Sequence, residues 1–445
     1  METRAAILWE QDAPWSVEPI TLDPPKEGEV LVEMVASGMC HSDDHARTGD
    51  LPAITPLIGG HEGAGVVLEV GPGVTSVAPG DKVVFSFVPA CGQCPSCADG
   101  HSNLCDNGAA LLVGAQLDGT TRHHSKDGTD LWTMVCLGTF AEHTVVNEMS
   151  CVKVDDDVPL ELACLIGCGV TTGWGSSVYA ADIRPGDNVA VIGVGGIGAA
   201  AVQGARLAGA RNIVAIDPVE FKREQAHEFG ATHTAPSIGE AFELIQQLTW
   251  GRMCDKIICA VGVGDGEQIA PIMSLCAKRG RVVVTNIHPA SEGQISISLC
   301  DLTLMEKQLV GTIFGSANPH SDIPRLMHLH RSGQLDRAIE IYRRLAKAST
   351  GNFDVRRLLI YALLQADRLK EATASARRLR EQHPENVHSH LLFGAAVQAT
   401  GALEPALDSF QTAISLAPDL AEAHYLAGNM LGALGRYEEA VARFD

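Results

Sequence analysis

The sequence predicts an α/β protein: a strand-rich domain, then a doubly wound parallel sheet, then an all-α array of helical repeats. Three observations carry this prediction. Short β-branched runs separated by turns fill residues 1–160, strands alternate with helical segments from about residue 170, and residue types recur with a fixed period beyond about residue 333. The length of 445 residues fits three such units, since domains average about 150 residues.

The first two regions differ in the order of their elements. In the first, β-branched runs bounded by proline and glycine turn signals predict strands at Val30–Val35, Gly65–Val70, Lys82–Val88 and Thr144–Val146. In the second, the predicted strands are Asn188–Ile192, Ile213–Ile216, Lys256–Cys259 and Val282–Thr285, and the helices between them include Ile197–Leu207 and Glu220–Phe229. Such alternation indicates one parallel sheet with helices on both faces.

The third region repeats every 34 residues. Ala372, Ala406 and Ala440 share this spacing. The same spacing separates Gly394 from Gly428, Gly401 from Gly435, Pro384 from Pro418 and Phe410 from Phe444, and the phase extends back to Gly333, Ala338 and Tyr342. The pattern resembles the tetratricopeptide repeat, in which small residues let paired helices approach and an aromatic side chain fills the gap between pairs. The alternative is an unrelated helical bundle with accidental spacing.

Charge and cysteine content divide the chain at about residue 336. Residues 337–445 hold 13 basic and 13 acidic residues, whereas residues 1–336 hold 20 basic against 41 acidic residues and so carry the whole net charge of −21. All 13 cysteines also lie before residue 337. Two differently composed polypeptides are therefore joined here.

Composition excludes several classes of protein. With 46% hydrophobic and 20% charged residues, the chain can bury a large core and is not disordered throughout. The acidic excess argues against nucleic acid and anionic membrane surfaces as main partners. The N-terminus lacks the apolar stretch of a secretory signal, and the most apolar segment, residues 189–205, is too short and glycine-interrupted to span a membrane. We therefore expect a cytoplasmic protein whose cysteines are metal ligands or buried thiols.

Two sets of residues have the chemistry of zinc ligands. The first set is compact and consists of Cys91, Cys94, Cys97 and Cys105, whose four thiolates can surround one tetrahedral Zn²⁺ in a closed, structural site. Its alternatives are reduced loop cysteines without a metal, or an iron–sulfur cluster. The second set is dispersed and consists of Cys40, His61 and Cys168. Two thiolates and one imidazole leave a zinc position open, as in catalytic sites, although each of the three alone is as readily a structural residue.

A glycine-rich turn follows the strand at Asn188–Ile192. It reads Gly193-Val-Gly195-Gly196-Ile197-Gly198 and leads into a helix, so its backbone can approach a pyrophosphate at the positive end of the helix dipole. Asp217 stands 19 residues after Gly198, at the end of the next strand. An acid there accepts the ribose hydroxyls of NAD and repels the extra phosphate of NADP. Lys222 and Arg223 nearby keep NADP as the alternative.

Together and in this order, these three elements resemble the zinc-dependent medium-chain alcohol dehydrogenases over residues 1 to about 335. Finer motifs are similar to those of the nitrosoaniline-dependent, mycofactocin-associated members of this family. They include Gly-Cys168-Gly-Val-Thr-Thr-Gly-Trp-Gly and Phe314-Gly-Ser-Ala-Asn-Pro. The group with the next greatest resemblance is the glutathione-dependent formaldehyde dehydrogenases. The resemblance implies a GroES-like zinc catalytic domain at residues 1–166, a Rossmann NAD-binding domain at 167–312, a truncated return to the catalytic domain at 313–336 and tetratricopeptide repeats at 337–445.

The resemblance also implies roles for individual residues. The implied ligands of the catalytic zinc are Cys40, His61 and Cys168. The groups implied around that metal are Asp43, which orients His61, Glu62, which approaches the metal during ligand exchange, and the proton relay of Ser42 and His45. The implied contacts to NAD are His41, Thr172, Gly193, Gly195, Gly196, Ile197, Gly198, Asp217 and Lys222. The implied walls of an apolar alcohol pocket are Leu51 and Phe87, for which ordinary core packing is the alternative.

The activity implied by the resemblance is the zinc-dependent conversion of an alcohol to an aldehyde, or the reverse, by hydride transfer to NAD, in a homodimer with two zinc ions per chain. In the nitrosoaniline-dependent members, NAD stays bound and an external redox carrier takes the electrons. One departure stands out: the closing segment that follows Gly333-Gln-Leu-Asp336 in the family is replaced here by the repeats. The second hypothesis is therefore an interaction protein whose repeats bind a protein partner, with a dehydrogenase part that is inactive or only binds NAD.

Overall fold

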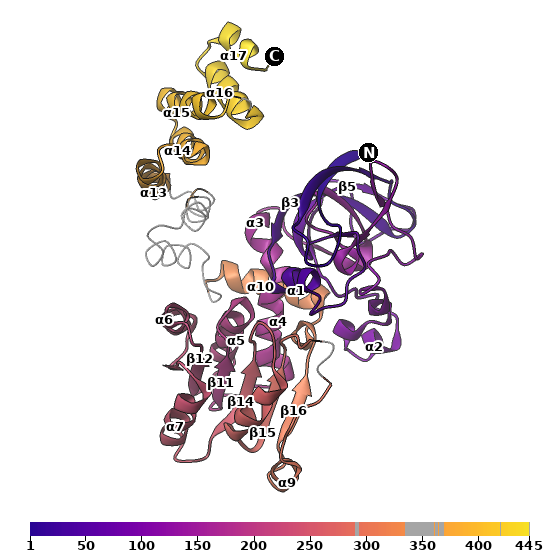
Figure 1. Cartoon of the computed structure of the whole chain (residues 1–445), viewed down its shortest axis with the longest axis vertical. Helices are drawn as coiled ribbons and strands as arrows, with labels where there is room; N and C mark the ends of the chain where they lie inside the picture. The colour runs from indigo at the N-terminus through magenta and orange to yellow at the C-terminus, as the bar shows by residue number, and fades with distance from the viewer. Residues whose placement is uncertain (290–292, 334–359, 361–363, 365–368, 419, 445) are drawn as a thin grey trace. The chain divides into compact units, whose positions relative to one another are not determined.

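The computed structural model describes residues 1–289, 293–333, 360, 364, 369–418 and 420–444 of the chain (Figure 1). They form two compact units, Met1–Leu335 and Asp336–Asp445. The first unit contains strands and helices, and the described part of the second contains helices alone. The predicted fold class, α/β with an all-α tail, is confirmed. Ala338 and Tyr342, which the sequence assigns to the repeats, lie outside the described residues.

Two sheets build the strand-rich part of the first unit. A closed barrel has the strand order β1 (Glu2–Leu8), β2 (Ser16–Leu22), β7 (His123–Ser125), β8 (Asp130–Thr133) and β4 (Leu57–Ile58). An antiparallel sheet has the order β10 (Cys151–Lys153), β6 (Lys82–Phe85), β5 (Glu62–Val70), β3 (Glu29–Gly38) and β9 (His143–Asn147). Side chains of the antiparallel sheet form one buried cluster, which includes Val30, Val32, Val67, Val83, Phe85 and Val146, and side chains of the barrel form another, which includes Ile7, Ile20, Ile58 and Leu131. The four strands predicted in this region are confirmed, except that the strand predicted at Lys82–Val88 ends at Phe85.

Short helices connect these strands. They are α1 (His41–Thr48), α2 (Pro95–Ala98) and α3 (Leu160–Ala163). α1 follows β3 directly and ends at Gly49, whose φ of 83° is a left-handed conformation that favours glycine. The chain therefore turns sharply at the end of this helix.

A six-stranded parallel sheet forms the rest of the first unit. Its strand order is β13 (His233–Ala235), β12 (Asn212–Ile216), β11 (Asn188–Ile192), β14 (Cys254–Cys259), β15 (Cys276–Val284) and β16 (Gln308–Gly311). The connecting helices are α5 (Gly196–Leu207), α6 (Glu220–Phe229), α7 (Ile238–Leu248), α8 (Ile269–Ser274) and α9 (Leu299–Leu304). The strand order reverses direction at β11, and ligands bind outside the carboxyl ends of the strands at such a point. The predicted β–α–β pattern is confirmed.

Two helices link the parallel sheet to the strand-rich part. α4 (Gly169–Gly175) leads into the parallel sheet and packs against α5, and α10 (Pro319–Arg331) follows the sheet. Ile323, Leu326 and Met327 of α10 are buried in a cluster with side chains of β10 and the segment after it. The Nη1 atom of Arg331 also lies 2.7 Å from a carboxylate oxygen of Asp155. After the parallel sheet, the chain thus returns to the strand-rich part.

The described helices of the second unit pack in sequence order. They are α13 (Leu369–Gln382), α14 (Val387–Ala399), α15 (Leu403–Leu416), α16 (Ala421–Ala433) and α17 (Tyr437–Phe444). Ala406 and Phe410 of α15 are fully buried, and a Cβ added to Gly394 of α14 would lie 2.4 Å from the ring of Phe410. The small residue and the aromatic therefore meet as the repeat pattern predicts.

Among the described residues, no helix is long and apolar enough to cross a membrane.

The repeats also share a polar contact. The Nε2 atom of His390 lies 2.8 Å from the carbonyl oxygen of Pro384, and that of His424 lies 2.7 Å from the carbonyl oxygen of Pro418. Both pairs occupy the same phase of the 34-residue period. Each histidine therefore fastens the start of its helix to the turn that precedes it.

We predict that Gly394→Ala loosens the second unit, because the added methyl group collides with Phe410. The local free energy of unfolding of α14 and α15 should fall by about 1–3 kcal/mol. Gly432→Ala is the matched control, since a Cβ there meets nothing within 4 Å and alanine favours a helix by up to about 1 kcal/mol. Hydrogen exchange of the full chain, followed by mass spectrometry, measures the protection of α14 and α15 in both variants. Equal protection of α14 in the two variants would contradict the assigned packing.

Candidate active site

One cluster of metal-ligating side chains forms where three segments of the first unit meet. Cys40 precedes α1, His61 and Glu62 stand at the start of β5, and Cys168 precedes α4. One ligand atom from each of the four lies within 4.8 Å of the others. Because Gly38 at the end of β3 pairs with Glu62, the antiparallel register of β3 and β5 brings residue 40 next to residue 61. Cys168 and Glu62 are joined through the N–H of Gly169, which donates to a carboxylate oxygen of Glu62 at 3.1 Å.

Asp43 holds this cluster in place. Its side chain is buried and accepts the N–H of Cys40 at 3.0 Å and the N–H of Gly60 at 3.1 Å. It also lies 3.1 Å from Nδ1 of His61, so the Nε2 atom of His61 remains as the metal-facing nitrogen. The structure therefore brings Asp43 to the position that the resemblance implies for it.

Proton affinities in the cluster suit a divalent cation. A hydrogen bond from Cys168 holds the pKa of Cys40 down at about 3, and the same bond together with burial holds the pKa of Cys168 well above its usual range. Burial lowers the pKa of His61, but hydrogen bonds to Asp43 and Cys40 outweigh it and raise the pKa to about 10. Burial raises the pKa of Glu62 to about 7. The close ligand atoms thus share protons. A metal ion that binds there displaces these protons and is held by thiolates, a carboxylate and a neutral imidazole.

The relay residues lie on α1 beside the cluster. The Sγ atom of Cys40 is 3.6 Å from the hydroxyl oxygen of Ser42, and the rings of His41 and His45 are 4.9 Å apart, centre to centre. His45 is buried, and its Nδ1 atom lies 3.2 Å from a carboxylate oxygen of Asp50. Asp50 is a functional candidate that sequence reasoning missed. In the sequence, only the position of Asp50 just after Gly49, the glycine that ends α1, could have indicated that it lies near His45.

The four cysteines of the compact set also converge. Their sulfur atoms lie within 4.8 Å of one another in the loop that contains α2. Backbone N–H groups point at these sulfurs: those of Gln93 and Cys94 donate to Cys91 and hold its pKa at about 7, while burial raises the pKa of Cys105 to about 12. Four sulfurs with such backbone support match a closed tetrahedral zinc site.

The glycine turn lies at the carboxyl end of β11, where α5 begins. A Cβ on Gly198 would lie 1.8 Å from the carbonyl oxygen of Gly193, so the turn requires glycine at that point. By contrast, a Cβ on Gly195 or Gly196 would meet nothing within 4 Å, which leaves open space over the start of α5. Ile197, which follows them, is half-buried. Open backbone at a helix N-terminus fits a pyrophosphate.

Asp217 ends β12 next to this turn. Its carboxylate accepts the N–H of Val194 at 2.8 Å and the N–H of Val219 at 2.9 Å, and Nζ of Lys222 lies 3.8 Å away. These donors leave lone pairs on both oxygens for a ribose hydroxyl. Thr172 lies one helical turn after Cys168 and donates its backbone N–H to the carbonyl of that residue. Its buried hydroxyl has no hydrogen-bond partner among the described residues.

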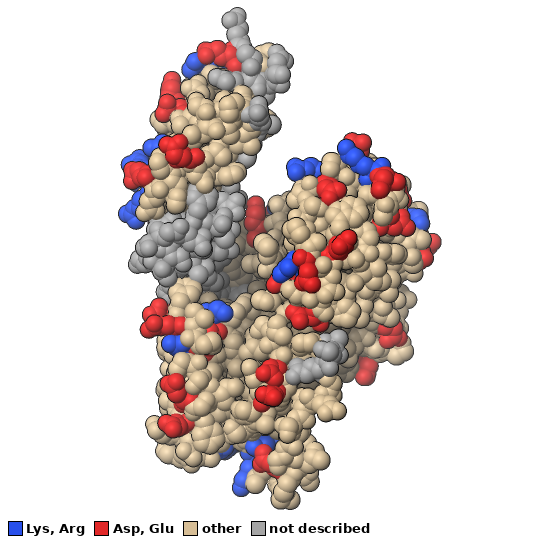
Figure 2. All heavy atoms as spheres, viewed as in Figure 1, with Lys and Arg blue, Asp and Glu red and all other residues tan. Residues whose placement is uncertain are grey.

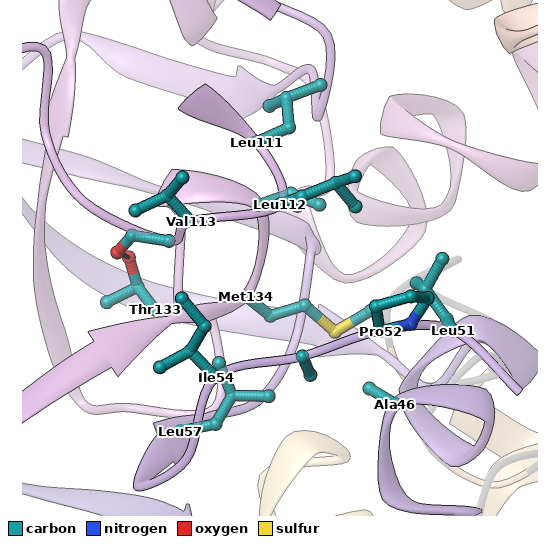
Figure 3. A pocket seen from close by; sticks show the side chains of 13 residues that line it. Ala46, Leu51, Pro52, Ile54, Leu57, Leu111, Leu112, Val113, Thr133 and Met134 are labelled. Atoms are coloured by element: carbon teal, nitrogen blue, oxygen red, sulfur yellow. Dashed lines mark hydrogen bonds between the residues drawn. The ribbon is translucent and has the colours of Figure 1, made fainter. Parts of the chain in front are cut away.

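The two residues assigned to an alcohol pocket fall into different clusters. Phe87 packs edge-on against His61 at 5.9 Å and against Phe314 at 5.3 Å, measured between ring centres. Leu51 lines an apolar pocket with side chains from the 111–114 segment and the turn after β8 (Figure 3). Phe87 is not among the residues that line this pocket, but Leu111 lines it and also packs against the cluster that Phe87 joins.

Comparison with known proteins agrees with this geometry. The model of the alcohol dehydrogenase GroES-like domain matches residues 26–156, that of the zinc-binding dehydrogenases matches residues 196–332, and that of the tetratricopeptide repeat matches residues 329–392. Alcohol dehydrogenase B of Mycobacterium tuberculosis is 50% identical over 338 residues, which are 76% of this chain and 90% of that protein. The NDMA-dependent alcohol dehydrogenase of Amycolatopsis methanolica is 48% identical over 358 residues, 80% of this chain and 96% of that protein.

Solved structures agree as well. An alcohol dehydrogenase zinc-binding domain protein from Burkholderia ambifaria superposes with a TM-score of 0.71 at 34% identity, over 76% of this chain and 90% of that one. Benzyl alcohol dehydrogenase from Acinetobacter calcoaceticus superposes with a TM-score of 0.70 at 29% identity, over 76% and 91%.

Fold and ligand sets together define a zinc-binding, dinucleotide-dependent dehydrogenase built from a GroES-like and a Rossmann domain. Within that class, the chain belongs to the zinc-dependent medium-chain alcohol dehydrogenase family and carries a tetratricopeptide-repeat tail. The family predicted from the sequence is confirmed, and with it the prediction that the chain is an enzyme that needs zinc and a nicotinamide dinucleotide.

We predict that Asp43→Asn weakens metal binding at the dispersed set by about 10- to 100-fold, the usual cost of losing a carboxylate behind a ligating histidine. Asparagine presents one oxygen where Asp43 serves three N–H donors. Dialysis against graded chelator, with metal content read by elemental analysis, measures the affinity. Asp44→Asn is the control, because Asp44 stands on the same helix but is half exposed and pairs with Arg47. Equal retention of metal in both variants would contradict the role of Asp43.

Proposed function

We propose that this dehydrogenase oxidises an apolar alcohol with two zinc ions in different roles, prefers NAD to NADP, keeps the NAD bound and passes the electrons to an external redox carrier. The observation that carries the proposal is the buried set of Cys40, His61 and Cys168 with Glu62 beside it. Two thiolates and an imidazole leave one position for the substrate oxygen, with Glu62 as the ligand that exchanges. The set of Cys91, Cys94, Cys97 and Cys105 has no such position and suits a structural zinc.

When bound, zinc supplies a Lewis acid to the alcohol oxygen and NAD supplies the hydride acceptor. The residues of this chain supply the rest. Ser42, next to Cys40, accepts the alcohol proton and passes it to His45. Since Nδ1 of His45 faces Asp50, Nε2 is the atom left to take up that proton, and Nδ1 passes a proton to the half-exposed carboxylate of Asp50 and from there to solvent. Phe87 packs against His61, Phe314 packs behind Phe87, and these aromatic rings keep water from the reacting atoms.

Cofactor binding is assigned to the carboxyl edge of the parallel sheet. The turn Gly193–Gly198 takes the pyrophosphate, with Gly195, Gly196 and Ile197 at the start of α5, and His41 supplies a base beside it. Asp217 takes the ribose hydroxyls, and Lys222 pairs with Asp217 rather than offering a separate phosphate site. Tight retention of NAD and transfer to an external acceptor rest on the 48% identity to the NDMA-dependent relative.

Further assignments concern the partners of the enzyme. The apolar pocket beside Leu51, with Phe87 nearer the metal, favours an alcohol with a hydrocarbon tail. The repeats offer a site for a protein partner. None of the thirteen cysteines, all of which lie among the described residues, forms a disulfide bond, which supports a reducing, cytoplasmic location. A homodimer is proposed from family membership alone.

We predict that each chain binds two zinc ions and that each ion can be removed by a different substitution. Cys168→Ser should retain one zinc and lose turnover, because the remaining ligands no longer hold the reactive metal. Cys94→Ser should lose the other zinc and yield less soluble protein, because its loop loses the metal that folds it. Turnover is assayed by nitrosoaniline reduction, and wild type should turn over without added NAD. Fewer than one zinc in well-folded wild type would contradict both assignments.

We predict that wild type binds NAD more tightly than NADP. Asp217→Ala should lower the ratio of the two dissociation constants, NADP over NAD, by about tenfold or more, because it removes roughly 1.4 kcal/mol of charge repulsion against the extra phosphate of NADP. Titration of both cofactors measures it. Asp255→Ala is the matched control, because Asp255 also accepts a backbone N–H of the same sheet but at the amino end of its strands. Tighter binding of NADP to wild type would show that Asp217 has another role.

A further inference from the structure

A short turn after β16 has an unusual backbone. Phe314, Gly315 and Ser316 follow one another with φ angles of 56°, 62° and 59°, all in the left-handed region. Phenylalanine and serine adopt this conformation only at a cost in free energy, so such a run persists where the surrounding structure fixes it. Residues 314–316 are called the left-handed turn below. Contacts from two other segments of the first unit hold it.

The first of these segments is α4. A Cβ on Gly315 would lie 2.3 Å from the carbonyl oxygen of Thr172, and a Cβ on Gly175 would lie 2.5 Å from the carbonyl oxygen of Gly315. The two backbones are therefore in direct contact, and glycine is required on both sides. Because α4 begins immediately after Cys168, the left-handed turn is fixed relative to that ligand.

The second segment is the loop of the four cysteines, residues 91–105. The Nδ2 atom of Asn103 donates to the carbonyl oxygen of Ile313 at 3.2 Å, across 210 residues of the chain. The same carbonyl accepts the N–H of Ser316 at 3.0 Å, the bond that closes the left-handed turn. Asn103 is buried in the 3₁₀ turn Ser102–Leu104, which leads directly into Cys105. The position of the amide therefore follows that of the cysteines.

Asn103 uses its amide as a donor alone. Its Oδ1 atom is buried and has no hydrogen-bond partner within the described part of the chain. An unpaired buried acceptor costs free energy, so an apolar side chain of the same shape would stabilise the loop better. The amide therefore serves the contact with Ile313 rather than the stability of its own loop.

From the left-handed turn, packed rings reach the metal cluster. The ring of Phe314 lies edge-on to that of Phe87 at 5.3 Å, and Phe87 lies edge-on to His61 at 5.9 Å, measured between ring centres. Phe314 is fully buried, so its ring cannot move without displacing its neighbours. Contiguous packing of this kind carries energetic coupling between separate sites. A displacement of the left-handed turn is thus passed on to the imidazole.

We propose that Asn103 is a positioning residue of the active site. From the four-cysteine loop it holds the left-handed turn in place, and the turn sets the rings of Phe314 and Phe87 against His61. The inference rests on the proposed function, since it takes the buried cluster around His61 as the site of reaction. The four-cysteine loop then has a second task besides its own folding, because it fixes the aromatic wall of the reactive cluster.

Hydrogen exchange of the full-length protein tests the contact itself. Asn103→Leu keeps the branched shape of the side chain and removes the donor. The amides of residues 314–317 should exchange about three- to tenfold faster, as expected for the loss of one hydrogen bond. Residues 94–105 should keep their protection, and elemental analysis should find the zinc content of wild type. Leu104→Ala is the matched control, because Leu104 shares the 3₁₀ turn but is exposed, and it should change neither segment.

A double-mutant cycle tests the consequence for the reaction. Asn103→Leu should lower the turnover of nitrosoaniline reduction about tenfold, because small misplacements at the reacting centre are costly. In a Phe87→Leu background the path of rings to His61 is already broken, so the same change should lower turnover less than twofold. A loss of folded protein alone would lower turnover equally in both backgrounds.

Three results would overturn the inference while leaving the proposed function intact. They are unchanged exchange of residues 314–317 in Asn103→Leu, faster exchange confined to residues 94–105, and an equal loss of turnover in the two backgrounds. The last two would show that Asn103 stabilises only its own loop. If wild type loaded with zinc and NAD has no turnover at all, the proposed function fails, and the role of Asn103 in positioning the reactive cluster fails with it.

Discussion

The buried carboxylate of Asp43 is the contact on which the site depends. Through three hydrogen bonds, it joins the start of α1 to the turn before β5 and orients His61. A charged side chain is stable in such a place only when its oxygens are occupied, and here they are occupied by two backbone N–H groups and one imidazole. Removing Asp43 would therefore affect the two metal-ligating segments together. The first unit assembles its reactive cluster around this one group.

The two parts of the first unit supply different components of the site (Figure 1). The strand-rich part supplies Cys40, His61 and the relay, and the parallel sheet supplies the cofactor edge. Cys168 stands at the start of α4, the helix that leads from one part into the other. Because that ligand precedes the helix that packs against α5, metal position and cofactor position are mechanically linked. Small movements between the two parts change the separation of the reacting atoms, to which hydride transfer is highly sensitive.

The chain returns to the strand-rich part through α10. α10 buries Ile323, Leu326 and Met327, and Arg331 bridges the Asp155 and Asp157 carboxylates. These contacts fasten α10 to the strand-rich part. Surface charge follows the same boundary, since the acidic excess belongs to residues 1–336 and the repeats are balanced; on the face drawn in Figure 2, acidic groups are scattered over the first unit. The tail thus differs from the dehydrogenase in composition as well as in fold.

The sequence by itself determined every feature in which neighbouring residues act together. The spacing of Cys91, Cys94, Cys97 and Cys105, the glycine turn at 193–198 and the 34-residue period are local patterns, and backbone geometry alone dictates what such patterns form. The convergence of Cys40, His61 and Cys168 could be expected only from resemblance, because the register of β3 against β5 creates it. Only the tertiary structure decided the partner of His45, the separation of Leu51 from Phe87, and the unpartnered amide of Asn286 beside Gly264. The last two depend on contacts between segments far apart in the chain, for which neither spacing nor composition carries a signal. The first depends on the left-handed turn at Gly49, which folds Asp50 back against His45 of the same helix.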